Sequence, residues 1–340
     1  MNAKIGIREV AAHAGVSLGT VSNVLNGLPS VTPRNADKVR RAMDELGFVP
    51  NANARQLRAS KTNSIGMVVL NIANPFFAEV AHDAQGVAES HGTDIVIASS
   101  DQEQSREDRY LGMFEESRVR GLIVAPVNGV TQRMQQVAAR GTPIVLLDEH
   151  VDAARFCSVS LDGTVGGYTA ARHLIDLGRR RLGFVGGPLL QVADRVSGVG
   201  KAIAESPGAI LAMFETPDLT VEQGRAAAHR IAALPERDRP DGVFAGNDLV
   251  ALGLLQGLAE QGISVPDDIA LVGYDDIDYA RTAAIPLTSI AQPHSRIAEE
   301  AIRLLLEEES DSGGAHQHQE VRLTPELVVR ASTVSRPTPR

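Results

Sequence analysis

The chain has 340 residues, too many for one compact core, and 43% of them are hydrophobic, so an accessory domain beside a bilobed globular body is expected. The single cysteine, Cys157, excludes an internal disulfide and fits a reducing compartment. The first residues lack the apolar core of a signal peptide, and no stretch reaches the roughly twenty apolar residues that cross a bilayer. We therefore expect a cytoplasmic protein with no membrane partner.

The charge is distributed unevenly along the chain. Residues 1–60 contain eight basic and four acidic residues, a net charge of +4, whereas the whole chain carries −9, so the remainder carries −13. Basic side chains attract phosphate and release its counterions, so a small cationic segment on an acidic body indicates a local DNA contact. A merely solvated surface is the alternative explanation.

The first fifty residues have the pattern of three short helices. A helix over residues 7–14, a glycine turn and a capped second helix are typical of a helix-turn-helix, whose second helix enters the major groove. An αα-hairpin that only packs fits the same pattern. The residues expected to begin or end the helices are Gly15, Ser17, Gly27, Thr32, Pro33 and Gly47.

Residues 51–58 are too few to hold a stable helix alone, because nucleation is costly and few hydrogen bonds follow. Folding on contact with DNA is the natural use of such a segment, and Arg55 and Arg58 favour it. An ordinary flexible linker is the alternative.

From Ser64 onward, short apolar runs alternate with longer amphipathic ones, which predicts βαβ units in two doubly wound parallel-sheet lobes. Ligands of such sheets bind beyond the carboxyl ends of the strands. Polar or aromatic residues follow these runs, as a sugar-like ligand requires. Asp248 and Asp276 are better explained as caps of the following helices. The remaining candidates are residues 74–77, Asp101, Asp148, Asn247 and Asp275.

The segments IREVAAHAGVSLGTVSNVLNG and VTPRNADKVRRAMDELGFVPNANARQL resemble the DNA-binding head of the lactose-repressor (LacI/GalR) family. The resemblance implies that Leu18, Gly19 and Asn23 read bases, while Ser17, Thr20, Ser22 and Asn26 contact the DNA backbone. It also implies that residues 51–61 form the hinge helix and linker, with Arg55 near the DNA and Leu57 wedged into the minor groove. Gly19 departs from the longer side chain common at its position and contributes no side-chain readout.

The same resemblance extends over the body, through NPFF, DRVSG, AGNDLVALG, VPDDIALVGYDD and PLTSIAQP. It implies a periplasmic-binding-protein-like effector domain over residues 62–335, with one lobe at about 62–161 plus 293–322 and the other at about 162–292 plus 323–335. A homodimer on a pseudo-palindromic operator is also implied. The implied effector contacts are Phe76, Asp148, Arg195, Asn247 and Asp275, with Asp101, Leu219 and Gln292 in the pocket wall.

The sequence lacks the motifs of an enzyme. No G-x-G-x-x-G, H-E-x-x-H or G-x-S-x-G pattern occurs, and Gly200-Lys201 is followed by Ala202 and is therefore no P-loop. We expect no catalytic residue, cofactor or metal. His316 and His318 could bind a metal ion, but we interpret them as part of a solvated loop. A sugar-binding transport protein is a second alternative, against which the helix-turn-helix argues.

The expected function is a transcriptional repressor controlled by a sugar or related polyol, with a purine or nucleoside as the alternative effector.

Overall fold

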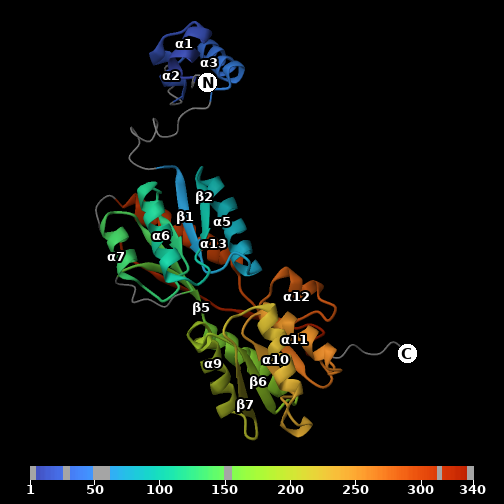
Figure 1. Cartoon of the computed structure of the whole chain (residues 1–340). Coiled ribbons are helices and arrows are strands. Elements are labelled where there is room, and N and C mark those ends of the chain that lie inside the picture. Colours follow the sequence, from blue (N-terminus) through green and yellow to red (C-terminus); the bar gives the residue numbers. More distant parts are fainter. Residues whose placement is uncertain (1–4, 26–30, 49–61, 149–154, 312–315, 335–340) are drawn as a thin grey trace. The chain divides into compact units, whose positions relative to one another are not determined.

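A computed structural model shows that the chain divides into two compact units, Met1–Thr62 and Asn63–Arg340, here called the head and the body (Figure 1). Each unit has a hydrophobic core of its own. The structure describes residues 5–25, 31–48, 62–148, 155–311 and 316–334.

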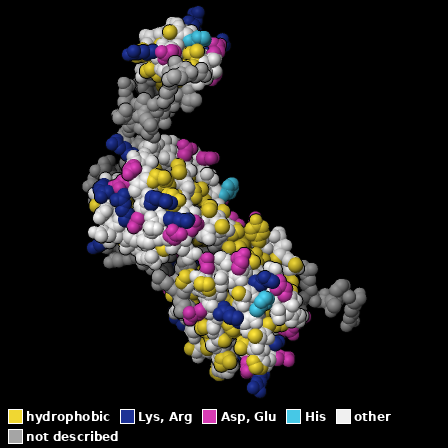
Figure 2. Space-filling model, viewed as in Figure 1, with side chains coloured by type: hydrophobic (Ala, Val, Ile, Leu, Met, Phe, Trp, Pro, Cys, Tyr) yellow, Lys and Arg dark blue, Asp and Glu magenta, His cyan; other side chains and the backbone are white. Residues whose placement is uncertain are grey.

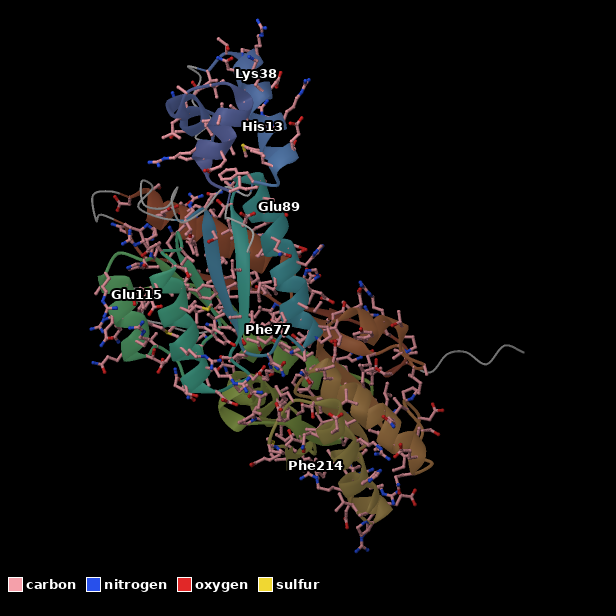
Figure 3. All side chains as sticks on the ribbon, turned by 45° about the horizontal axis from the view of Figure 1, so that its top comes forward. His13, Lys38, Phe77, Glu89, Glu115 and Phe214 are labelled. Atoms are coloured by element: carbon pink, nitrogen blue, oxygen red, sulfur yellow. The ribbon has the colours of Figure 1, made fainter. Side chains whose placement is uncertain are left out.

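Three helices make up the described part of the head (Figure 1). Their inner faces meet in a small core that contains Val10, Val21 and Val39, all fully buried. His13 of the first helix is labelled in Figure 3. It pairs with Glu45 of the third helix, with 2.6 Å between Nε2 and Oε2. The predicted helix-turn-helix is confirmed. The helices are α1 (Ile7–Ala14), α2 (Leu18–Leu25) and α3 (Pro33–Leu46).

The described ends of these helices lie where the sequence predicts them, and Gly27, expected to end α2, lies outside the described residues. Gly15 ends α1 in the left-handed conformation, with φ of 64°, and its N–H donates to carbonyls of the last turn. The Ser17 hydroxyl accepts from the Thr20 N–H at 3.1 Å, which satisfies one of the unpaired donors at the start of α2. Gly47 ends α3 in the same left-handed conformation as Gly15.

The body contains two sheets of six strands each. The first sheet is entirely parallel, with strand order β11-β5-β4-β3-β1-β2. Helices α5 and α13 cover one of its faces, and α6 and α7 cover the other (Figure 1). The elements of this first lobe are β1 (Ser64–Val69), α5 (Pro75–Ser90), β2 (Asp94–Ser99), α6 (Gln104–Glu116), β3 (Leu122–Val124), α7 (Gln132–Ala139), β4 (Ile144–Leu147), β5 (Cys157–Leu161), α13 (His294–Ser310) and β11 (Glu320–Leu323).

The second sheet has the order β12-β10-β9-β8-β6-β7, and only β12 runs antiparallel to its neighbour. Helices α8 and α9 pack on one face and α10 and α11 on the other. Its elements are α8 (Gly163–Asp176), β6 (Arg181–Gly186), α9 (Leu189–Ala204), β7 (Ile210–Glu215), α10 (Val221–Ala232), the 3-10 turn Glu236–Asp238, β8 (Gly242–Ala245), α11 (Asp248–Glu260), β9 (Ala270–Asp275), α12 (Asp278–Thr282), β10 (Thr288–Ala291) and β12 (Glu326–Val328).

The two lobes are joined by three passages of the backbone. The chain leaves the first sheet after β5, returns to it after β10, and leaves it again between β11 and β12. Acidic and basic side chains are intermingled on the face of the body that Figure 2 presents. No helix among the described residues is long and apolar enough to span a membrane.

Candidate functional site

The exposed face of α2 carries the residues expected to contact DNA. Leu18 and Gly19 are exposed in the first turn. Leu18 is 44% exposed, although Val21 of the same helix is fully buried. Ser22 and Asn23 follow four residues later on the same face, because residues i and i+4 are neighbours on a helix. Asn26, Arg55 and Leu57 lie outside the described residues.

The best-defined part of the body's candidate site is the guanidinium of Arg195, carried by α9. Its Cζ lies 3.8 Å from the ring centroid of Tyr274, the penultimate residue of β9. Arg195 also donates from Nη1 to the carbonyl of Gly246, which follows β8. A cation over an aromatic face is attracted by the ring quadrupole, so these two contacts fix the orientation of the guanidinium.

Close packing of two helices brings Arg195 to this position. Gly167 of α8 lies so near the backbone of α9 that a Cβ there would come within 1.9 Å of the Arg195 carbonyl oxygen. Only glycine permits this approach. The glycine therefore sets the distance between α8 and the turn of α9 that carries the arginine.

Asp275 ends β9 and is buried beside Gln292, which follows β10. The Gln292 amide donates to Asp275 Oδ1 at 2.5 Å. Burial raises the pKa of the Asp275 carboxyl to about 7, although Arg195 and Gln292 both act to lower it. The carboxyl therefore changes charge near neutral pH, which makes it a strongly perturbed group at the carboxyl end of a strand.

Several acidic residues at or just after the ends of strands have unusual backbone conformations. Asp101, Asp148, Asp275 and Asp276 all have positive φ, between 49° and 109°. Such conformations cost free energy in residues other than glycine and are concentrated at binding sites. Asp148 is exposed, and its charge affects the pKa of both Arg195 and Asp275.

Asn247 has a structural role that the sequence analysis did not assign to it. Its Oδ1 accepts from the Val250 N–H at 2.9 Å and caps α11, and its Nδ2 donates to the Leu219 carbonyl at 3.3 Å. The side chain thereby ties the start of α11 to the half-buried Leu219.

The prediction that Asp248 and Asp276 are helix caps is wrong. Asn247 caps α11, and the N-cap position of α12 is Ile277. Asp248 is fully buried instead, where it accepts from the Ser289 hydroxyl at 2.7 Å and the Ile277 N–H at 3.0 Å. It fits because Gly273 of β9 leaves the space, since a Cβ there would lie 2.0 Å from Asp248 Oδ1.

Asp276 forms an ion pair with Arg330 that includes a contact of 3.1 Å between Nη2 and Oδ2. This pair joins the end of β9 to the chain beyond β12. The two aspartates therefore anchor the strand ends next to Asp275.

The candidates of the first lobe are less closely connected. Phe76 is buried in the first turn of α5, edge-to-face with Phe77 at 5.2 Å between ring centroids. Asn74 caps this helix, and its side chain acts to lower the pKa of Asp275 of the other lobe. Asp101 is exposed and interacts with Ser99 and Arg106. A further hydrogen bond of 2.9 Å runs from Gln102 to Asp218 and links the two lobes.

Direct hydrogen bonds join Arg195 to Gly246, Asn247 to Leu219 and Gln292 to Asp275, whereas Asp101 is engaged by its own neighbours. Sequence reasoning missed Tyr274. The sequence does place an aromatic residue directly before the aspartate that ends the strand. The hydrophobic pattern of the strand, however, does not distinguish such a residue from an ordinary core residue.

Comparisons with known proteins agree with this architecture. Residues 6–51 match the model of the bacterial regulatory proteins of the lacI family, and residues 171–333 match that of the periplasmic binding protein-like domain. The chain is 34% identical to the HTH-type transcriptional repressor PurR of Photobacterium profundum, over 96% of this chain and 98% of that one. The chain belongs to the LacI family of transcriptional regulators.

Solved structures of LacI-family regulators share the fold. A complex of the transcriptional regulator CelR with cellobiose matches 96% of this chain and 99% of that chain, with 30% identity and a TM-score of 0.70. The lac repressor dimer bound to operator and the anti-inducer ONPF matches 98% of this chain and 100% of that chain, with 26% identity and a TM-score of 0.81. The family resemblance, the fold class and the absence of enzymatic function predicted from the sequence are confirmed.

In this LacI-family head, two substitutions of Ser17 separate helix capping from DNA contact. Ser17→Ala removes the bond to Thr20 and is expected to destabilise the head by about 1 kcal/mol. Ser17→Asp keeps an N-cap oxygen but adds a negative charge, so we expect it to preserve stability and to weaken operator binding more than alanine does. Thermal unfolding and operator affinity at fixed salt measure the two effects.

Thr32→Ala is the matched control for Ser17, because the Thr32 side chain makes no capping hydrogen bond to α3. We expect it to change the stability of the head less than Ser17→Ala does. If Ser17→Ala and Ser17→Asp bind the operator with equal affinity, Ser17 does not contact the DNA backbone.

Asn23 is expected to read a base edge. Replacing it by alanine should change which operator sequence is recovered from a random duplex library, because a lost bidentate pair costs about 1–3 kcal/mol of discrimination. Ser22→Ala is the comparison, for which we expect a weaker affinity with an unchanged sequence preference. An unchanged preference in Asn23→Ala would show that this residue does not contribute to readout.

Proposed function

We propose that this LacI-family regulator is a sequence-specific repressor, active as a homodimer, whose operator affinity is controlled by a sugar or related polyol. On the DNA side, the exposed N-terminal face of α2 supports the proposal. Leu18 is a large apolar side chain left in solvent, next to the exposed Gly19 and the half-buried Asn23. In this proposal these three residues read bases in the major groove, and Ser17, Thr20, Ser22 and Asn26 position the head on the DNA backbone.

The dimer is proposed from symmetry and from the relatives. The lac repressor was solved as a dimer on its operator, and its structure matches almost the whole of this chain. A two-fold symmetric pair of heads reads a pseudo-palindrome. In this arrangement Arg55 contacts the DNA, and Leu57 inserts into the minor groove between the half-sites.

The fixed guanidinium of Arg195 is the observation that carries the effector proposal. It lies over Tyr274 with Asp275 and Asp148 as its acidic neighbours, so donors and acceptors of hydrogen bonds converge at one place. Paired carboxylates and a forked cation suit the vicinal hydroxyls of a carbohydrate. The CelR structure contains cellobiose, which is a precedent for a sugar on this fold.

A purine or nucleoside is the second candidate effector, because the curated relatives include purine repressors by name. A flat heteroaromatic ring is held best by aromatic faces. Among the eight proposed effector residues, Phe76 is the only aromatic one, and the ring of Tyr274 is covered by the Arg195 guanidinium. This composition favours the carbohydrate.

In the proposed mechanism the effector binds at the carboxyl ends of the strands of both sheets. Contacts to Phe76 and Asp148 on one lobe and to Arg195 and Asp275 on the other would change the angle between lobes. Such a change alters how two first lobes sit in a dimer and therefore whether two heads engage one operator.

Operator selection from a random duplex library with the full-length protein tests the DNA part of the proposal. A recovered pseudo-palindrome supports the dimeric repressor, and purely salt-sensitive, sequence-independent binding contradicts it unless added ligand restores selection. A calorimetric screen of pentoses, hexoses, polyols, purines and nucleosides tests the effector. Binding of purines without any carbohydrate would refute the sugar.

A further inference from the structure

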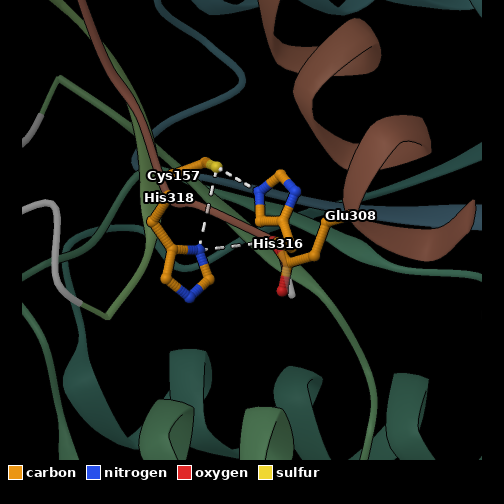
Figure 4. A group of neighbouring side chains, drawn as sticks. All are labelled: Cys157, Glu308, His316 and His318. Atoms are coloured by element: carbon orange, nitrogen blue, oxygen red, sulfur yellow. Dashed lines mark hydrogen bonds and ion pairs between the residues drawn. The ribbon is translucent and has the colours of Figure 1, made fainter. Parts of the chain in front are cut away.

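Four potential metal ligands from distant parts of the sequence meet in the first lobe: Cys157, Glu308, His316 and His318 (Figure 4). Their donor atoms all lie within 4.8 Å of one another. Cys157 Sγ is 3.1 Å from His316 Nε2 and 3.8 Å from His318 Nδ1, and His318 Nδ1 is 3.8 Å from Glu308 Oε2. The interpretation of the two histidines as a solvated loop is wrong, because both are half-buried against Cys157.

Strand pairing explains how these side chains converge. β11 runs parallel to β5 with Glu320 opposite Ser158, and the Ser158 N–H donates to the Gln319 carbonyl at 2.9 Å. The pairing places the two histidines, just before β11, beside Cys157 at the start of β5. Residues two apart in an extended segment point to the same side, so both rings can face one point. Glu308 approaches the same point from the last turn of α13.

One member of the cluster is fully buried and the other three are half-buried. The Cys157 side chain is fully buried, and Glu308 Oε2 is buried without a hydrogen-bond donor among the described residues. A carboxylate oxygen without a donor costs free energy in such a place, and a bound cation would offset that cost.

The distances match the requirements of one metal ion. Zn²⁺ prefers four ligands in a tetrahedron, with bonds of about 2.3 Å to sulfur and 2.0–2.2 Å to nitrogen and oxygen. Ligand atoms of such a tetrahedron are about 3.4–3.6 Å apart. Three of the six separations in the cluster lie between 3.1 and 3.8 Å, and the other three do not exceed 4.8 Å. Thiolate and imidazole ligands exclude Mg²⁺ and Ca²⁺, which require oxygen.

We propose that Cys157, Glu308, His316 and His318 bind one Zn²⁺ ion per chain. The ion is held by a thiolate, two imidazoles and a carboxylate, and its binding releases the thiol proton to solvent. It fastens β5, the end of α13 and the segment before β11 to one another. All four ligands lie at or near the amino ends of the parallel strands, whereas the effector candidates follow carboxyl ends, so this site is separate from the proposed effector site.

The position of the site also connects it to the start of β1. Glu309, next to Glu308, pairs with Arg120 at 2.6 Å, and the Arg120 N–H donates to the carbonyl of Ser64, the first residue of β1. The ion therefore stabilises the amino-terminal ends of these strands, including the start of β1, where the body begins. Zn²⁺ should raise the unfolding temperature of the full-length protein, since a ligand that binds only the folded state stabilises it.

Co²⁺ titration of the metal-free, untagged full-length protein tests the proposal. We expect one Co²⁺ per chain, with a sulfur-to-metal charge-transfer band and the intense visible bands of tetrahedral Co²⁺, and displacement by one equivalent of Zn²⁺. Cys157→Ser should remove the charge-transfer band. Glu308→Gln, His316→Gln and His318→Gln should each weaken Zn²⁺ binding at least about tenfold.

His82→Gln is the matched control, because His82 is an exposed histidine of the same lobe outside the cluster. We expect it to bind both metals like the unchanged protein, and circular dichroism checks that each variant is folded. The proposal is overturned if micromolar Co²⁺ or Zn²⁺ does not bind, if Co²⁺ binds without a thiolate band, or if His316→Gln and His318→Gln bind Zn²⁺ with unchanged affinity.

Discussion

Replacing Arg195 by alanine is expected to weaken effector binding roughly 100-fold or more, because hydrogen bonds to a charged group contribute about 1.5–3 kcal/mol each and a fork makes more than one. The operator complex should then no longer respond to effector concentrations that act on the unchanged protein. Calorimetry with the effector identified by the ligand screen measures the affinity, and operator binding with and without it measures the response.

Arg195→Lys should not restore binding, because an ammonium lacks the planar fork that stacks on Tyr274 and reaches Gly246. Arg237→Ala is the matched control, since Arg237 lies in the same lobe and 86% of its side chain is exposed. Effector affinity in Arg195→Ala equal to that of Arg237→Ala would remove Arg195 from the proposed site.

Asp275→Asn is expected to change the pH dependence of stability. The folded protein raises the pKa of this carboxyl to about 7 from 3.8, so between these values the folded state binds more protons than the unfolded state. Its contribution to stability is therefore present at low pH and is lost as the pH rises towards 7. Between pH 5 and pH 8 this one group should lower the free energy of unfolding by about 3 kcal/mol.

Asparagine cannot ionise, and its carbonyl still accepts from Gln292. We therefore expect Asp275→Asn to lose less stability than the unchanged protein over this pH range, as measured by urea unfolding at several pH values. The exposed Asp238→Asn is the control and should follow the unchanged protein. Parallel stability curves for the Asp275 variant and the unchanged protein would show that this carboxyl is ionised well below pH 7.

Local signals made much of the fold predictable. Ser17 and the left-handed Gly15 and Gly47 are residues whose chemistry begins or ends a helix, whatever the rest of the protein does. The apolar runs likewise predicted the strands, because parallel strands are buried on both faces and read as continuous hydrophobic segments.

The errors concern side chains whose environment depends on distant residues. Asn247 and Asp248 are adjacent, and both are suitable caps, yet only one can occupy the N-cap position. Asp248 enters the core because Gly273, on another strand, leaves room for it. No local pattern contains that information. Tyr274 was missed for a similar reason, since its importance arises from Arg195 on a different helix.

Cys157 and His318 illustrate the same limit over a longer distance. They are separated by 161 residues in the sequence, and only the parallel pairing of β5 with β11 brings them together. Metal sites with short, regular spacing between ligands can be recognised from sequence, whereas this cluster depends on the order of strands in the sheet.

The three passages of the backbone between the sheets limit how this protein can be cut or recombined. Each lobe is assembled from separate stretches of the chain, so no simple truncation yields one lobe alone. A protease that cleaves one passage leaves two covalent connections. The head, by contrast, is a continuous N-terminal segment joined to the body once. A single genetic exchange near residue 62 can therefore give the body a new operator specificity, but no single exchange can replace one lobe.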